Sequence, residues 1–282
     1  MLISYIQTQA DFESKWAEFL SSIHAVKEWC NTLGPEKLPP LEYMNIIGSA
    51  TAQHYRNNMK ILFEEICVRS RITSSSSVID LGCGCGCGRL STPMIKYLAS
   101  GKFWGYDVWE DGINWCLAHL RLNDCQKFVH LNASDNYYFS DNSASTLKNR
   151  FRLNEVSDNS IDLVYAISVF THLKHDDCIS YISEISRVLK PKGLAYLTFF
   201  VLDSFFFDFR NSTGIHTAIN PDPSCKYQTA YSGQDFFVGI TRDYLEEVIS
   251  SNSLHLLTFE TGSWAQKPGS NRYQDLAIIY KA

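Results

Sequence analysis

Apolar and polar residues follow a helical spacing in the first quarter of the chain. Residues 9–33 and 41–70 place apolar side chains three and four positions apart, as Met59 and Phe63 do on one face. The pair Pro39-Pro40 separates the two stretches, because proline has no N–H for the interior of a helix. The pattern therefore predicts a helical N-terminal segment.

From residue 78 onward, short apolar runs alternate with helical patterns. The predicted strands are 78–82, 103–107, 127–131, 161–167, 194–201, 254–261 and 273–281, and the predicted helices are 88–99, 111–121, 175–190 and 242–250. Nearly continuous apolar strands that alternate with helices are typical of a parallel sheet covered on both faces. Only a loop separates the last two strands, which indicates an antiparallel terminal strand. We expect an α/β fold with a seven-stranded, mostly parallel sheet.

The same pattern suggests how the chain is divided. We predict an N-terminal helical extension or cap at 1–72 and a second domain at 73–282. Two stretches, 132–158 and 203–235, lack a clear pattern, and long connections of this kind are often lids at the carboxyl ends of parallel strands. Phe206 and Phe207 in the second stretch either line a ligand pocket or pack under the lid.

Composition excludes several classes of protein. The chain has 282 residues, 45% hydrophobic and 20% charged, as in an ordinary globular protein, and its net charge of −5 argues against a nucleic-acid partner. No apolar stretch approaches the roughly 20 residues that span a bilayer, so we expect no membrane partner. Asp11 and Glu13 follow the start closely, which argues against a secretory signal. Nine cysteines, an odd number, indicate reduced thiols and a cytoplasmic protein. We expect a monomer or a homodimer.

The run from Val78 to Leu90 is the most informative segment, because an apolar strand ends in an acid and alternate residues are then glycine. Glycine lets a ligand lie against bare backbone, and the following helix start favours a negative group. Asp80 favours hydroxyls or a cation, so the loop suits a ligand with a carboxylate, a cation and a ribose. The dinucleotide fingerprint G-x-G-x-x-G/A fits in no register. Three cysteines alternate with these glycines, but a second pair of ligands is missing and we expect no metal.

The spacing Asp80-x-Gly82-x-Gly84-x-Gly86 resembles motif I of the class I S-adenosylmethionine-dependent methyltransferases. Residues 160–165 resemble the fourth-strand motif of this family, and 168–173 and 187–193 resemble the segments that follow it. The resemblance covers 78–202 firmly and 236–282 loosely, and it is nearest to bacterial enzymes that tailor glycans or secondary metabolites. It implies a Rossmann-like fold with S-adenosylmethionine as cofactor. One departure is an extra Cys-Gly pair ending at Gly88, which could shift the helix start by a turn.

The resemblance also implies a cofactor site. Asp107 ends the second strand, where a carboxylate can accept two hydrogen bonds from a ribose diol. Val108 and Trp109 follow and could pack on the adenine, although Trp109 could equally be a surface aromatic. Asp135 and Asn136 fall where the family contacts the adenine amino group, or they form a simple Asx-turn. The complete predicted cofactor set is Asp80, Gly82, Cys83, Gly84, Gly86, Asp107, Val108, Trp109, Asp135, Asn136 and Ile167.

His172 is the candidate catalytic base, because it lies just past the fourth strand and an alcohol acceptor must lose a proton. An imidazole titrates near pH 6.5, which suits a base, but His172 could instead cap the next helix. Candidates for substrate binding are Tyr55, His216, Tyr227 and Tyr231.

The sequence therefore predicts a methyltransferase that acts on a hydroxyl of a small molecule, a sugar or a natural-product scaffold such as a peptide or polyketide. Two alternatives stay open. One is N-methylation of an amine or a protein side chain, and the other is a non-catalytic module that binds S-adenosylmethionine.

Overall fold

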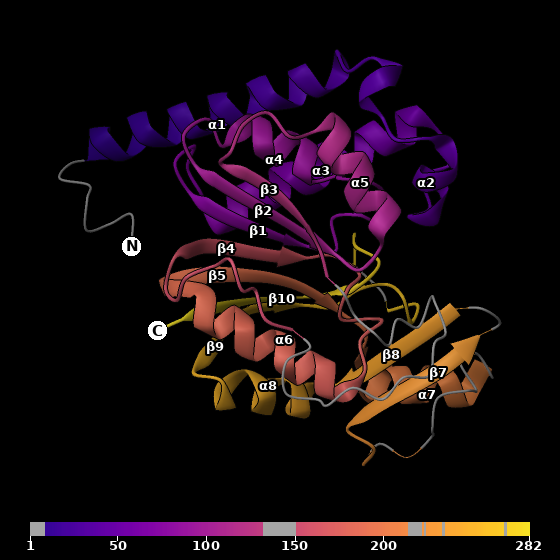
Figure 1. Cartoon of the computed structure of the whole chain (residues 1–282). Coiled ribbons are helices and arrows are strands. Elements are labelled where there is room, and N and C mark those ends of the chain that lie inside the picture. The colour runs from indigo at the N-terminus through magenta and orange to yellow at the C-terminus, as the bar shows by residue number, and fades with distance from the viewer. Residues whose placement is uncertain (1–8, 132–150, 214–221, 223, 233–234, 268–269) are drawn as a thin grey trace. The chain divides into compact units, whose positions relative to one another are not determined.

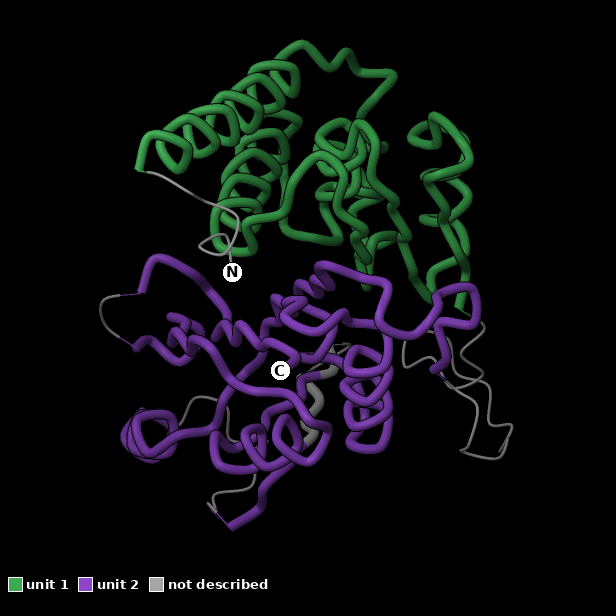
Figure 2. Tube along the Cα trace, turned by 90° about the vertical axis from the view of Figure 1, so that its left-hand side faces the viewer, with its two compact units in different colours: residues 1–131 green, residues 132–282 purple. Residues whose placement is uncertain are grey.

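The chain forms two compact units, residues 1–131 (unit 1) and 132–282 (unit 2) (Figure 2). The computed structural model describes residues 9–131, 151–213, 222, 224–232, 235–267 and 270–282. The boundary between the two units, after residue 131, follows the third strand of the chain directly. The functional domains expected at 1–72 and 73–282 are a different division and stay a prediction.

Unit 1 begins with helices, as the pattern predicted (Figure 1). They are α1 (Gln9–Asn31), the short 3-10 helix η2 (Pro35–Lys37), α2 (Leu41–Ile46) and α3 (Ala52–Ser70). The single helix expected at 41–70 is interrupted because Gly48 adopts a φ of 71° and Thr51 caps a new helix. The Thr51 side chain accepts a hydrogen bond from the His54 N–H at 3.1 Å, which satisfies one of the free donors of the first turn.

Three parallel strands complete unit 1, in the order β3-β2-β1. The elements are β1 (Ser77–Leu81), α4 (Ser91–Tyr97), β2 (Lys102–Asp107), α5 (Glu110–His119) and β3 (Gln126–His130). The strands lie within one residue of their predicted bounds. Helix α4 starts at Ser91, three residues later than predicted, because the extended glycine run occupies the first turn.

Unit 2 holds four further strands of the main sheet and a small second sheet. Its elements are β4 (Ile161–Ala166), α6 (His175–Val188), β5 (Leu189–Phe199), β6 (Val201–Leu202), α7 (Ser204–Thr213), β7 (Tyr227–Ser232), β8 (Asp235–Thr241), α8 (Arg242–Ser251), β9 (Leu254–Glu260) and β10 (Asp275–Lys281). Strand β5 pairs in parallel with β4, and β10 is antiparallel to β5 and β9. The second sheet has the order β6-β8-β7.

The strand order is β3-β2-β1 in unit 1 and β4-β5-β10-β9 in unit 2, seven strands in all, with flanking helices. The predicted mostly parallel, Rossmann-like fold with one antiparallel terminal strand is thereby confirmed. In the described part of the chain, no helix combines the length and apolar character needed to span a bilayer.

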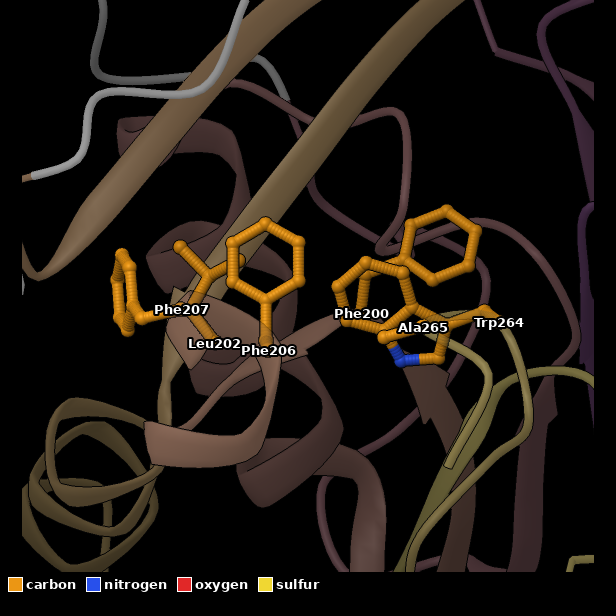
Figure 3. Close-up of a cluster of buried hydrophobic side chains, with 6 residues drawn as sticks. All are labelled: Phe200, Leu202, Phe206, Phe207, Trp264 and Ala265. Carbon is orange, nitrogen blue, oxygen red and sulfur yellow. The ribbon is translucent and has the colours of Figure 1, made fainter. Parts of the chain in front are cut away.

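The stretch 203–235, which the pattern left unassigned, contains helix α7 and strand β7. Phe206 and Phe207 are buried, and they belong to an aromatic cluster around Phe200 and Trp264 (Figure 3). The ring centroids of Phe206 and Trp264 are 5.1 Å apart, which is a favourable stacking distance. Of the two readings of these phenylalanines, packing is therefore the correct one.

Buried charges fix this aromatic cluster to the main sheet. Asp275 is fully buried, and its Oδ2 accepts hydrogen bonds from the Trp264 indole N–H at 2.6 Å and the Val201 N–H at 2.7 Å. The ammonium of Lys267, also buried, lies 2.8 Å from the Asp203 carboxylate and 3.5 Å from that of Asp275. Since buried charges are tolerated only when they are paired, this group holds the segment around Trp264 in one position.

Candidate functional site

The glycine loop, residues 82–90, connects β1 to α4 and folds on its own backbone. The Gly88 N–H donates to the Cys83 carbonyl at 2.7 Å, and the Cys87 N–H donates to the Gly84 carbonyl at 2.6 Å. Cys87 has a φ of 41°, a left-handed conformation that is uncommon outside glycine. The loop is therefore a compact turn with its own hydrogen bonds, placed at the carboxyl end of β1.

Asp107, at the end of β2, accepts hydrogen bonds from the backbone of this loop. Its Oδ2 accepts from the Gly84 N–H at 2.7 Å and the Cys85 N–H at 3.2 Å, and its Oδ1 accepts from the Trp109 N–H at 2.8 Å. A Cβ on Gly84 would lie 2.9 Å from the Cβ of Asp107, so this approach requires glycine. Burial raises the pKa of Asp107, while backbone N–H groups from Trp109, Gly84, Cys85 and Val108 oppose that rise.

The residues after Asp107 are held by neighbouring elements of unit 1. The carbonyl of Val108 accepts a hydrogen bond at 3.0 Å from Nε2 of His130, at the end of β3. The Trp109 ring meets the Tyr43 ring of α2 edge to face, with centroids 4.7 Å apart. Both Val108 and Trp109 are half-buried, so they retain surface that a flat ring could contact.

The N-terminal helices contact the glycine loop directly. The Tyr55 hydroxyl, from α3, donates to the Gly86 carbonyl at 2.8 Å. A Cβ on Gly86, which has a φ of 80°, would lie 2.6 Å from the Ile47 Cδ1. Tyr55 is only 1% exposed, so the side chain expected to bind substrate holds the loop in this structure.

We expect Tyr55→Phe to lower the free energy of unfolding by about 1–3 kcal/mol, because the buried Gly86 carbonyl loses its donor. Urea denaturation followed by circular dichroism measures this change. Tyr273→Phe is the matched control, since Tyr273 is 65% exposed and its loss of a hydroxyl should change stability by less than about 0.5 kcal/mol. Equal effects of the two substitutions would contradict the assignment.

Asp80 joins β1 to the first residue of α4. Its Oδ2 accepts a hydrogen bond from the Ser91 hydroxyl at 2.7 Å, and the carboxylate is buried. Burial lowers the pKa of Arg89, while the charges of Tyr55 and Asp80 act in the opposite direction. The hydroxyl that Asp80 binds in this structure is therefore one of the protein's own.

The cysteines of the loop differ in accessibility. Cys83 and Cys87 are buried and Cys85 is exposed. Burial raises the pKa of the Cys83 and Cys87 thiols. Within the described residues, no group of three or more His, Cys, Asp or Glu side chains could hold a metal ion.

Cys85 should react slowly with alkylating agents even though the residue is exposed. Desolvation of the thiol by the loop, followed by the negative charge of Asp107, raises the pKa of Cys85 to about 12. Since the thiolate is the nucleophile, we expect iodoacetamide at pH 8 to modify Cys85 at least about tenfold more slowly than the exposed Cys125. Peptide mass spectrometry gives both rates, and equal labelling would contradict the predicted environment.

In unit 2, the turn after β4 has a fixed conformation. Ser168 has a φ of 61°, and its N–H donates to the Thr198 hydroxyl at 2.8 Å while its own hydroxyl donates to Gln274 Oε1 at 3.0 Å. Phe170 is buried, with its ring centroid 5.0 Å from that of Phe199. A strained backbone persists only where its surroundings hold it, and such turns cluster at functional sites.

His172 and Tyr227 lie on or beside this turn. His172 is half-buried, and its backbone N–H donates to the Val169 carbonyl at 2.9 Å. The Tyr227 hydroxyl donates to the Leu173 carbonyl at 2.7 Å, so Tyr227 fixes the residue next to His172. Ile167, from the predicted cofactor set, is half-buried at the end of β4.

The structure places some predicted residues and not others. Asp135, Asn136 and His216 lie outside the described residues, and Tyr231 is part of β7. Sequence reasoning missed residues that contact the glycine loop, the residues after Asp107 or the turn after β4, namely Ile47, Tyr43, His130, Ser168 and Thr198. Of these residues, only Ser168 and His130 could have been identified from the sequence, since each lies at or just past the carboxyl end of a predicted strand.

Comparisons with known proteins agree with this fold. Residues 80–197 match the family model described as a methyltransferase domain. A SAM-dependent methyltransferase from Methanosarcina mazei is 17% identical, with a TM-score of 0.50 over 76% of this chain and 96% of that one. The PH0226 protein from Pyrococcus horikoshii is also 17% identical, with a TM-score of 0.52 over 86% of this chain and 96% of that one. The chain therefore contains a match to the methyltransferase domain at residues 80–197 and has the fold of a SAM-dependent methyltransferase.

Proposed function

We propose that this methyltransferase transfers a methyl group to a hydroxyl of a small molecule, in the class of sugars and natural-product scaffolds. The observation that supports it is a half-buried imidazole, His172, placed by the fixed turn after β4. An alcohol oxygen must lose its proton as it is methylated, and a positioned base meets that need. The net charge of −5 agrees with a small acceptor better than with a nucleic acid.

The residues of unit 1 fit the cofactor of the family, S-adenosylmethionine. The glycines give backbone that a ligand can approach closely, and the buried Asp107 carboxylate is a strong acceptor for hydroxyl donors. Asp107 would hold the ribose, Val108 and Trp109 would contact the adenine, and the glycine loop would hold the methionine portion. The cofactor supplies an electrophilic methyl group on a sulfonium.

Asp107 has a second role that affects how it would bind a diol. A carboxylate offers about four acceptor positions, and four backbone N–H groups already point to Asp107. A ribose diol would therefore share or replace the hydrogen bonds from Gly84 and Cys85. This exchange would couple cofactor binding to the conformation of the glycine loop.

The chemistry left to the protein is positioning and proton removal. Methyl transfer is an in-line displacement, so holding the acceptor oxygen about 3 Å from the methyl group supplies much of the rate. In this proposal His172 accepts the hydroxyl proton at a ring nitrogen, and Ser168, Tyr227 and Phe170 keep its segment in place.

Two measurements test the proposal in order. Isothermal titration calorimetry with S-adenosylhomocysteine tests the cofactor site. Incubation with 13C-methyl S-adenosylmethionine and a panel of hydroxyl-bearing sugars, phenols and small amines tests the reaction, and the 13C shift of the product separates O-methyl from N-methyl groups. Methyl groups found on nitrogen would replace the proposal by N-methylation. Cofactor binding without turnover on hydroxyl or amine acceptors would favour the non-catalytic alternative.

A further inference from the structure

Unit 1 contains a cavity of about 260 Å³ that is separate from the surface formed by Asp107 and the glycine loop. It lies where the end of α1, the residues around η2, α4 and the end of α5 meet. Its floor consists of three buried apolar side chains, Leu33, Ile95 and Leu120, and Trp29 forms a half-buried wall. Apolar walls with a few polar groups at the edge are typical of small-molecule sites.

The charged residues around this cavity are mostly positive. Lys37 and Lys96 line it, and Glu36 is the one carboxylate among its lining residues. Neither lysine forms an ion pair with any residue in the described ranges. The Lys96 ammonium lies 5.4 Å from the centroid of the Trp29 ring, a cation–π distance that places the charge at the edge of the apolar surface.

Glu36 is the single negative group among the lining residues of the cavity. Its carboxylate lies close to Gly34, which also lines the cavity. The two lysines and one glutamate leave a net positive edge beside an apolar floor. An occupant that matches both features is apolar at one end and carries a single negative charge at the other.

We propose that this cavity binds a small apolar monoanion, consisting of one ring or a branched chain with a single carboxylate. The ring occupies the floor against Trp29 and Ile95, and the carboxylate lies beside Lys96 and Lys37. The volume is just below the roughly 300–1,000 Å³ of sites for drug-sized ligands, which limits the occupant to about one ring. This site is independent of the acceptor proposed above.

Two lining residues also hold the glycine loop. The Thr92 hydroxyl donates to the Gly88 carbonyl at 2.9 Å, and a Cβ on Gly88 would collide with Leu120 Cδ1. The binding test is therefore made on the full chain saturated with S-adenosylhomocysteine, so that the loop has one state and the cofactor site is blocked.

The probe is 3-phenylpropanoate, followed by NMR through the indole N–H signal of Trp29, which Trp29→Phe identifies. We expect a saturable shift of this signal. Lys96→Gln should weaken binding about two- to fivefold, and Glu36→Gln should tighten it by a similar factor, as for exposed charge pairs. Lys102→Gln makes the same charge change at the start of β2, outside the cavity, and should leave the affinity unchanged. The neutral analogue 3-phenylpropan-1-ol should bind more weakly, and its affinity should be the same for the wild type and for Lys96→Gln.

Three results would overturn the proposal. They are no shift of the Trp29 signal, binding that disappears when S-adenosylhomocysteine is added, and equal effects of Lys96→Gln and Lys102→Gln. Weaker binding after Glu36→Gln would also overturn it, because a carboxylate bound at this edge of the cavity is repelled by Glu36 and should bind more tightly without it. Calorimetry with S-adenosylhomocysteine alone reports on the cofactor site, so its failure is distinguishable from failure at this cavity.

Discussion

Asp107→Ala should lower the affinity for S-adenosylhomocysteine by about 10²–10⁴-fold. Two charge-assisted hydrogen bonds to the ribose are lost, each worth about 1.5–3 kcal/mol. In addition, the Gly84 and Cys85 N–H groups lose their acceptor, so the glycine loop loses the group that fixes it to β2. Isothermal titration calorimetry measures the affinity, and thermal unfolding of the same samples reports whether the variant is folded.

Two further variants make this result specific. Glu110→Ala removes an exposed carboxylate three residues away, in the first turn of α5, and should leave the affinity within about twofold. Asp107→Asn keeps one oxygen acceptor without the charge, and since neutral hydrogen bonds are about half as strong, we expect an intermediate loss of about 10–100-fold. Unchanged affinity in Asp107→Asn and Asp107→Ala would refute the ribose assignment.

Acidification gives an independent reading of the same carboxylate. Because cofactor binding depends on the ionised form of Asp107, the affinity should be high above the pKa of this carboxyl group. The affinity should be lost as the pH falls below that pKa. Because burial raises that pKa, the loss should begin at a higher pH than for an ordinary aspartate near 3.9. Titrations with S-adenosylhomocysteine from pH 8 downward should show this limb in the wild type and not in Asp107→Asn.

The main sheet was predictable because its strands are short apolar runs and its helices have a different period. Strands β1 to β4 begin and end within one residue of the predicted bounds. Strand β5 starts at Leu189, five residues earlier than predicted, and runs through Pro191, Lys192 and Gly193, which lie between the predicted helix 175–190 and the predicted strand 194–201. In this segment Lys192 has a φ of 70°, and the register of the pairing with β4 shifts. The spacing of apolar residues in the sequence does not predict such an irregularity.

The small sheet β6-β8-β7 was missed for a different reason. Strand β6 has two residues, and its ladder joins Val201 and Leu202 to Ile240 and Thr241, far away in the chain. Long-range pairing of such short segments leaves almost no local pattern, since what stabilises a strand is its neighbours. The aromatic residues of this region were visible in the sequence, but burial of Phe206 against Trp264 depends on contacts between distant segments.

The residues of the candidate site also differ in whether the sequence could predict them. The glycines and Asp107 could be identified because close backbone approach and an acid after a strand leave local signs. The residues that contact Gly86 and Trp109 could not be identified, because Ile47 and Tyr43 carry no distinguishing signal in the sequence. Tyr55 shows the limit most clearly: the residue was noticed, but only the hydrogen bond to Gly86 indicates what its hydroxyl does.

His172→Ala should lower the turnover rate by about 10²–10⁴-fold and leave the affinity for S-adenosylhomocysteine within about twofold. In the proposed reaction the imidazole takes the proton of the acceptor hydroxyl, a role that the cofactor site in unit 1 does not share. Initial rates with 13C-methyl S-adenosylmethionine and a hydroxyl acceptor measure the effect.

A base can be separated from a merely structural histidine by two comparisons. His172→Asn keeps a hydrogen-bonding side chain but cannot take up a proton, so it should be as slow as His172→Ala, whereas recovery of activity would show a capping role. His175→Ala removes an imidazole from the same segment whose nitrogens lie 2.9 Å from Asp176 and 2.5 Å from the Tyr244 hydroxyl. Because these partners lie on α6 and α8, we expect His175→Ala to keep the rate within about threefold. A full rate in His172→Ala would remove this residue from the mechanism and, with it, the main support for an oxygen acceptor.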